Sequence, residues 1–194
     1  MTSIRFSQWP TTAVRLVVAV GLAIGVVAAF ASPASADAPA PATPTAKYEI
    51  RFLEGMINHH AMAVEEGEIC LDRATHEELL ALCQNIIATQ SQEIELMQSW
   101  LSDWYGESHE PHMNPGQMNQ MEKMASLTGE EFEIDFMTSM IRHHQQAIRD
   151  AERCVDRAYH DELVQLCQGI IDAQRAEIEQ MQTWLCDWYS ICRD

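Results

Sequence analysis

Apolar residues recur every three or four positions along most of this chain, a spacing that predicts amphipathic α-helices. A first helix is predicted over about Tyr48–Arg73, where no Pro interrupts the pattern. After a short break at Ala74–Thr75, a second helix is predicted to end near Tyr105, because Gly106 is typical of the residue just past a helix C-terminus. Residues 48–105 are therefore predicted to form a helical hairpin.

The same pattern returns 84 residues later without a gap. The motif Phe-x3-Met-Ile-x-His-His begins at Phe52 and again at Phe136, and Cys, His, Trp and Tyr residues further along each copy repeat at the same offset. A second hairpin is therefore predicted over residues 129–194, starting at a capping box within Thr128–Glu131. Residues 106–128 are the crossover, predicted as a loop followed by one short amphipathic helix.

Two copies are too few for a solenoid, so the economical interpretation is a duplicated hairpin folded against itself. The predicted fold is all-α: a ferritin-like four-helix bundle made of the two hairpins and joined by the long crossover. The crossover helix carries a stripe of three methionines, Met118, Met121 and Met124, which we interpret as packing residues.

The N-terminus carries the pattern of a secretory signal peptide over residues 1–36. Two arginines precede an uncharged apolar run from Leu16 to Phe30, and a small-x-small cleavage site at Ala34–Ala36 follows. An uncleaved membrane anchor is the alternative, but the run is short for a membrane span. Residues 37–47 are rich in Ala and Pro and are predicted to be a flexible leader. The mature protein is therefore expected to be exported, either periplasmic or secreted, with no membrane insertion after cleavage.

The amino-acid composition indicates which class of binding partner to expect. The chain has 29 acidic and 12 basic residues and a net charge of -17, so nucleic acids and anionic membrane surfaces would repel it. It also has eight His, eleven Met and six Cys, whose side chains bind soft and borderline metals. A metal ion is therefore the expected partner, and the Trp- and Tyr-rich helix ends leave a homo-oligomer open.

Each copy places polar residues beside its apolar stripe. Because helical residues advance by about 100° each, His59 and His60 flank the stripe through Met56. On the second helix, Glu93 lies within the stripe through Met97. A charge in such a position is costly unless it is paired, protonated or bound to a metal.

The cysteines suggest an axial register for each hairpin. If the first two cysteines of a copy face each other, antiparallel pairing also brings the second His level with the Glu and the two methionines level with each other. These pairs are Cys70–Cys83, His60–Glu93 and Met56–Met97 in the first copy, and Cys154–Cys167, His144–Glu177 and Met140–Met181 in the second. Disulfides are expected in an oxidising compartment, with thiolate metal ligands as the alternative. Cys186 and Cys192 lack first-copy counterparts and could pair only if the last helix unwinds between them.

Folding the hairpins together would gather these groups near the middle of the bundle. The candidate metal ligands are His59, His60, His143, His144, Met56, Met140, Glu93, Glu177, Met97 and Met181. Copper is the expected ion, with zinc and iron as alternatives, because thioether ligands favour Cu(I). We expect one His of each pair to bind metal while the other bonds a carboxylate or reaches a neighbouring site. The alternative is a core in which these polar groups only satisfy one another and Met fills space.

The remaining histidines have weaker patterns. His109 and His112 lie with Met113 in the crossover loop and are candidates for an auxiliary copper contact. His76 and His160 begin the second helix of each copy, and we interpret them as capping or surface residues.

The repeated motifs resemble those of a known family. Met-Ile-x-His-His, followed about thirty residues later by Gln-x2-Glu-Ile-x2-Met-x2-Trp-Leu-x2-Trp-Tyr, occurs at Met56–His60 with Gln90–Tyr105 and at Met140–His144 with Gln174–Tyr189. This pairing is similar to the bacterial ferritin-like domain-of-unknown-function family 305. The resemblance implies an exported helical bundle, and some members of that family are periplasmic copper-binding proteins. The cysteines are additions to the family's core pattern, and the crossover is less rich in Met than in copper-binding members.

The leading hypothesis is a non-enzymatic, exported protein that binds copper and buffers or sequesters it outside the cytoplasm. A metal-dependent oxidase on the same bundle, either a ferroxidase or a cuprous oxidase, is the first alternative. Classical di-iron sites use Glu-x-x-His, and no Glu in this sequence has a His three residues later. A metal-free structural or interaction bundle is the second alternative.

Overall fold

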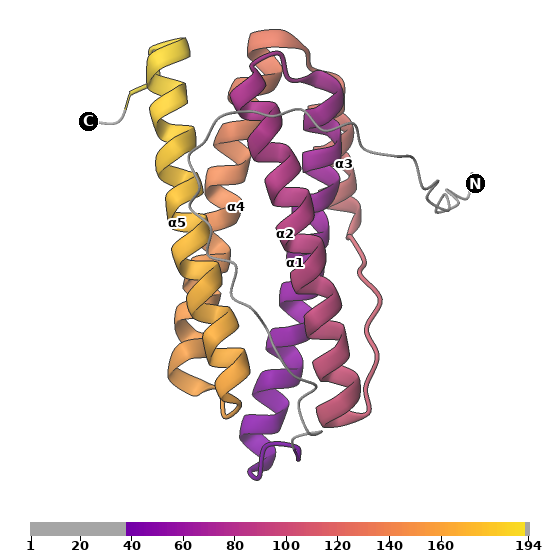
Figure 1. The fold of residues 1–194 in the computed structure, drawn as a ribbon. Coiled ribbons are helices and arrows are strands. Elements are labelled where there is room, and N and C mark those ends of the chain that lie inside the picture. Colours follow the sequence, from indigo (N-terminus) through magenta and orange to yellow (C-terminus); the bar gives the residue numbers. More distant parts are fainter. Residues whose placement is uncertain (1–37, 193–194) are drawn as a thin grey trace, which may run out of the picture. The chain divides into compact units, whose positions relative to one another are not determined.

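The computed structural model describes residues 38–192, so the predicted signal peptide lies outside the described residues. This part of the chain contains helices and no strand, which confirms the all-α class (Figure 1). No helix within it combines the length and low polarity that crossing a bilayer requires. The helices are α1 (Thr43–Arg73), α2 (Glu77–Tyr105), α3 (Pro115–Ala125), α4 (Gly129–Arg157) and α5 (Asp161–Tyr189).

The four long helices form two hairpins. Helix α1 packs along α2, helix α4 packs along α5, and the hairpins meet chiefly through α1 and α4 (Figure 1). Helix α3 packs against both α1 and α4. The predicted break at Ala74–Thr75 and the end at Gly106 are confirmed, and Gly106 has the positive φ of 65° that suits glycine after a helix.

Two predicted helix starts need correction. Helix α1 begins at Thr43, so residues 43–47 are helical and not part of a leader; Pro in the first turn is compatible with a helix because its missing N–H has no intrahelical partner there. The predicted capping box at Thr128 does not form. Gly129 has a φ of 58°, so the chain enters α4 in a different geometry. A capping box occurs instead at the start of α3, between Asn114 and Gln117.

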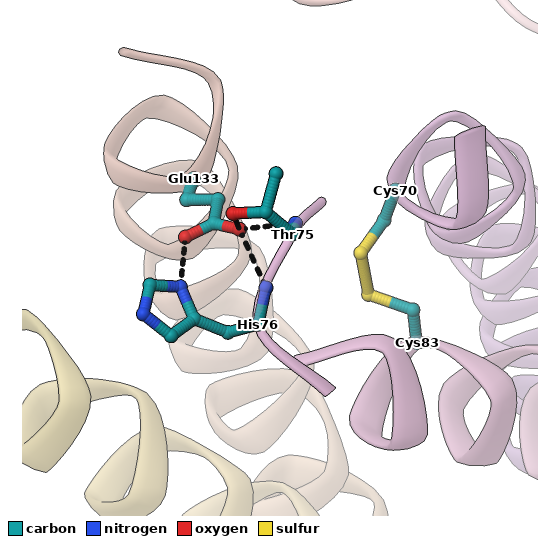
Figure 2. The surroundings of a disulfide bond; sticks show 5 residues. All are labelled: Cys70, Thr75, His76, Cys83 and Glu133. Atoms are coloured by element: carbon teal, nitrogen blue, oxygen red, sulfur yellow. Dashed lines mark hydrogen bonds and ion pairs between the residues drawn. A yellow bond between two sulfur atoms is a disulfide. The ribbon is translucent and has the colours of Figure 1, made fainter. Parts of the chain in front are cut away.

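Both predicted disulfides are present, Cys70–Cys83 and Cys154–Cys167, each joining the two helices of one hairpin with Cα atoms 6.2 Å apart. Figure 2 shows the first of them beside the turn between α1 and α2. The pair that the sequence left open, Cys186–Cys192, is also bonded. Helix α5 ends at Tyr189 and the left-handed Ser190 turns the chain back, which is the unwinding that this bond requires.

A buried glutamate of each hairpin binds the turn of the other hairpin. Glu133 of α4 accepts hydrogen bonds from the backbone N–H groups of Thr75 and His76 at 2.6 and 3.1 Å (Figure 2). The Thr75 hydroxyl at 2.9 Å, His76 Nδ1 at 2.6 Å and the Tyr189 hydroxyl also donate to this carboxylate. The bonds therefore join α4 and α5 to the turn that precedes α2.

The second hairpin's turn is held in the same way. Glu49 of α1 accepts from the N–H groups of Tyr159 and His160 at 2.6 and 3.1 Å, from His160 Nδ1 at 2.8 Å and from the Tyr105 hydroxyl. A tryptophan stacks on each turn histidine, Trp104 on His160 and Trp188 on His76, with ring centroids 3.8 and 3.9 Å apart. These reciprocal carboxylate clamps fix how the two hairpins sit against each other.

The clamps change the interpretation of both turn histidines. His76 and His160 occupy the N-cap positions of α2 and α5, but neither side chain caps its own helix. His160 is buried, so the surface interpretation is wrong for it. Each ring instead donates to a glutamate on a distant helix, a contact that helical periodicity alone does not reveal.

Candidate metal centre

The first histidines of the two copied motifs meet between α1 and α4. The rings of His59 and His143 lie against each other in a tilted arrangement, with their centroids 3.6 Å apart and their planes 39° from parallel. Each is next in sequence to a fully buried histidine, His60 or His144. The fold therefore brings all four histidines of the repeated motif into one region, as the sequence predicts.

The rings of His59 and His143 lack the partners that buried polar groups normally have. Among the described residues, neither nitrogen of His59 and not Nε2 of His143 has a hydrogen-bond partner, although all three atoms are shielded from solvent. Burial of the ring, with smaller effects from His60 and His144, lowers the pKa of His59 to about 3. Burial and the neighbouring His59 lower the pKa of His143 well below its ordinary value. Both rings are therefore neutral at pH 7, and each offers a nitrogen lone pair.

The second histidines pair with the predicted glutamates. His60 Nε2 donates to Glu93 Oε2 at 2.8 Å, while His60 Nδ1 has no partner in the described chain. His144 Nε2 lies 2.7 Å from Glu177 Oε2 in an ion-pair contact, while His144 Nδ1 has no hydrogen-bond partner in the described chain. These distances confirm the axial register that the cysteines suggested. On the second histidine of each pair, Nδ1 has no hydrogen-bond partner among the described residues.

Soft and amide side chains complete the surroundings. The four predicted methionines are all buried in the same core cluster: Met56, Met97, Met140 and Met181. Gln90 and Gln174 are also buried, and their Oε1 atoms have no partner among residues 38–192. No three His, Cys, Asp or Glu side chains in this range converge on one point as metal ligands do.

A pocket of about 430 Å³ reaches the centre from one side of the α1–α4 contact. Met56 and His59 contribute to its wall, together with residues of α4. On the other side, α3 covers the equivalent surface, since Gln117 and Gln120 contact Met62, Glu66 and Ser139. The counterparts of these three covered residues, 84 positions away, all line the open pocket: Gln146, Asp150 and Gly55. The two copies thus differ in access to the centre.

Sequence reasoning missed three buried carboxylates. Glu49 and Glu133 are one repeat apart, so extending the repeat one turn before Phe52 would have found them. Glu66 is buried beneath α3, and burial, with Asp135 nearby, raises its pKa to about 7. Its counterpart is an Asp, and the sequence carries no sign that α3 covers it.

The fold and the site together define a class of protein: a duplicated helical hairpin with a buried centre of histidines and methionines. Over residues 49–185 the sequence matches the model of a family described as a domain of unknown function, DUF305. The chain belongs to the DUF305 family, which confirms the resemblance seen in its motifs. No match is found among curated proteins.

Solved structures extend the comparison. CopM in the Cu(I)-bound form is 32% identical with a TM-score of 0.66, and the match covers 73% of this chain and 97% of CopM. CopM in the Cu(II)-bound form is 33% identical with the same TM-score and coverage. A DUF305 protein from Streptomyces coelicolor, provisionally described as secreted, is 27% identical with a TM-score of 0.64, covering 72% of this chain and 91% of that one.

Proposed function

We propose that this protein binds copper outside the cytoplasm and buffers or sequesters it, holding Cu(I) in the centre between α1 and α4. The observation that carries the proposal is the adjacent pair of His59 and His143, whose shielded nitrogens have no hydrogen-bond partner in the described chain. Buried polar atoms without partners are rare in native proteins, and a bound ion is one of the partners that satisfies them. Neutral imidazole and thioether groups are the donors that suit Cu(I).

The glutamates have an orienting role in this proposal. Metal-binding histidines usually donate their second N–H to a carboxylate or carbonyl, which fixes the tautomer and the ring orientation. His60 has this arrangement, because its Nε2 donates to Glu93 and leaves Nδ1 without a partner. Glu93 and Glu177 then support the ligands, while the histidines and Met56, Met97, Met140 and Met181 are the donors. The similarity to CopM, which was crystallised with Cu(I) and with Cu(II), supports the choice of copper.

The proposal also covers location and chemistry. Export is supported by three disulfides and by the Streptomyces coelicolor relative, and cleavage after Ala36 is part of the proposal. Mass spectrometry of the exported protein should find Asp37 at its N-terminus. We propose that the bundle has a ferritin-like arrangement and that its role is metal binding and not catalysis. Adding Fe(II) or Cu(I) should therefore cause no catalytic oxygen consumption.

The test is anaerobic titration of the mature, disulfide-bonded protein with Cu(I) in competition with a chromophoric chelator. The wild-type chain should bind Cu(I) stoichiometrically, and free copper at about 100 times Kd should raise its free energy of unfolding by about 2.7 kcal/mol. The double variant His59→Gln/His143→Gln should weaken binding by about tenfold or more. Met56→Leu/Met140→Leu, which nearly conserves core volume, should weaken Cu(I) binding too.

Met118→Leu is the matched control for the methionine pair, since it removes a thioether that is 44% exposed on α3 and is not one of the proposed ligands. It should leave Cu(I) binding at the centre unchanged. Absence of stoichiometric Cu(I) binding by the wild-type chain, together with unchanged thermal stability, would contradict the proposal. Full Cu(I) affinity in both double variants would contradict the site while leaving copper binding intact.

A further inference from the structure

The crossover loop is anchored on α1 by one amide. Asn58 Oδ1 accepts hydrogen bonds from His109 Nε2 at 2.9 Å and from the backbone N–H of His112 at 3.0 Å. Gln98 Nε2 of α2 donates to the His109 carbonyl at 2.9 Å. The loop therefore holds both histidines at fixed backbone positions above α1.

The anchoring also sets the tautomer of His109. An amide oxygen can only accept, so Nε2 must carry the proton in this bond, and in the neutral ring the lone pair is on Nδ1. Glu54 Oε1 lies 4.0 Å from that Nδ1. Two acceptors then face each other at a separation too long for a hydrogen bond. A cation between them would satisfy both.

The ring of His112 lies at a distance from the ring of His109 that suits two imidazoles bound to one ion. The ring centroids of His109 and His112 are 5.4 Å apart, with planes 57° from parallel. Two imidazoles on a tetrahedral zinc ion, each with a Zn–N bond of about 2.0–2.1 Å, have centroids roughly 5 Å apart. The observed spacing matches that arrangement. His112 is exposed and the Glu54 side chain is 39% exposed, so both side chains have room to rotate toward a shared ion.

We propose that Glu54, His109 and His112 form a surface site for a divalent cation of the zinc type, separate from the copper centre. The carbonyl of Asn58 serves as the group that orients the ligand His109, as outer partners of metal-bound histidines usually do. Two imidazoles and one carboxylate are ligands that zinc accepts, with water in the fourth position.

The repeat supports a specialised role for these residues. The positions equivalent to Glu54 and Asn58 in the second copy are Thr138 and Arg142, which neither bind a cation nor anchor such a loop. The second hairpin folds without this set. The hairpin fold therefore does not require Glu54, Asn58 and the two loop histidines.

The site is tested by titrating the mature, disulfide-bonded protein with Zn(II) in a calorimeter. The wild-type chain should bind one Zn(II) that His112→Gln and Glu54→Gln each weaken by about tenfold or more. X-ray absorption at the zinc edge should report two imidazoles and oxygen ligands. The core variant His59→Gln/His143→Gln should keep this Zn(II) affinity, so the result is independent of Cu(I) binding.

Glu110→Gln is the matched control, because it removes an exposed carboxylate from the same loop. It should leave Zn(II) affinity unchanged. Failure of the wild-type chain to bind Zn(II), or equal affinity in His112→Gln, would overturn the site. Equal losses in Glu54→Gln and Glu110→Gln would also overturn it, since they would indicate diffuse attraction to an acidic surface.

Discussion

Glu66 and Glu133 are both fully buried carboxyl groups, and their partners give them opposite acidities. Burial alone would raise the pKa of Glu133, but hydrogen bonds from Tyr189, Thr75 and His76 outweigh it and lower the pKa to about 2. Glu66 has one long contact, 3.5 Å from Gln120 Nε2, and its Oε2 has no partner among the described residues. Its pKa is therefore raised. Hydrogen bonding decides the charge of each group.

Replacing Glu133 with Gln should destabilise the protein by about 1–3 kcal/mol at pH 7, because the amide cannot accept every bond and turns an N–H₂ group toward donors. The lowered pKa makes the wild-type contribution present above the ordinary value of 4.5 and lost as pH falls toward 2. Urea unfolding at several pH values should therefore show that the free energy of unfolding falls less at acidic pH in Glu133→Gln than in the wild-type protein. The exposed Glu130→Gln is the control, and a similar cost there would contradict the clamp.

Replacing Glu66 with Gln should have the opposite pH dependence. Because the pKa of Glu66 is raised to about 7, unfolding releases its proton between pH 4.5 and 7, and the wild-type free energy of unfolding declines as pH rises through that window. Glu66→Gln lacks this decline, so its advantage should grow to on the order of 3 kcal/mol at pH 8. Thermal unfolding at pH 5 and pH 8 measures it. The exposed Glu68→Gln should show no such trend; a pH-independent difference for Glu66→Gln would contradict the burial argument.

At the scale of helices, α3 packs against the two hairpins through only one of its faces. Met124 and Met121 are buried against the hairpins, whereas Met118 is 44% exposed. The predicted stripe of three packing methionines is thus confirmed for two of them. Met124→Ala should cost about 2–5 kcal/mol through the cavity that it leaves. Met118→Ala, the same change on the same helix, should stay within about 0.5 kcal/mol. Equal effects in chemical denaturation would mean that α3 does not pack as described.

At the scale of the whole molecule, the repeat explains which features the sequence predicts. The turn between the two helices, the disulfide and the His60–Glu93 level all follow from spacing within one hairpin, and the repeat supplies each a second time. The clamps of Glu49 and Glu133 join different hairpins, more than 50 residues apart in sequence. Such contacts depend on how the hairpins dock, which periodicity does not determine. His59 and His143 were predicted as neighbours, but their geometry was not.

The two halves of the molecule are copies, yet their surfaces differ where they meet. Helix α3 covers Ser139 on one side, and the counterpart Gly55 lies exposed in the open pocket on the other. A chain duplicated without α3 would offer two equivalent approaches to the histidines. Covering one of them leaves the pocket beside Met56 and His59 as the approach that the described residues keep open. Under the copper proposal, this asymmetry gives the ion a single side of entry.

Gly55→Phe tests the entry side by placing a bulky side chain in the pocket while every proposed ligand is retained. A Cβ at Gly55 meets no atom within 4 Å and the residue is exposed, so the helix backbone accepts a side chain there, and removing a helical glycine should keep or raise stability by up to about 1 kcal/mol. We expect slower Cu(I) uptake at unchanged final stoichiometry, measured by following chelator release with time. Gly169→Phe on α5 is the matched control, since its Cβ is also unobstructed and it is outside the pocket lining. Equal uptake rates in the two variants would place the entry elsewhere, because only one of them obstructs the approach to His59.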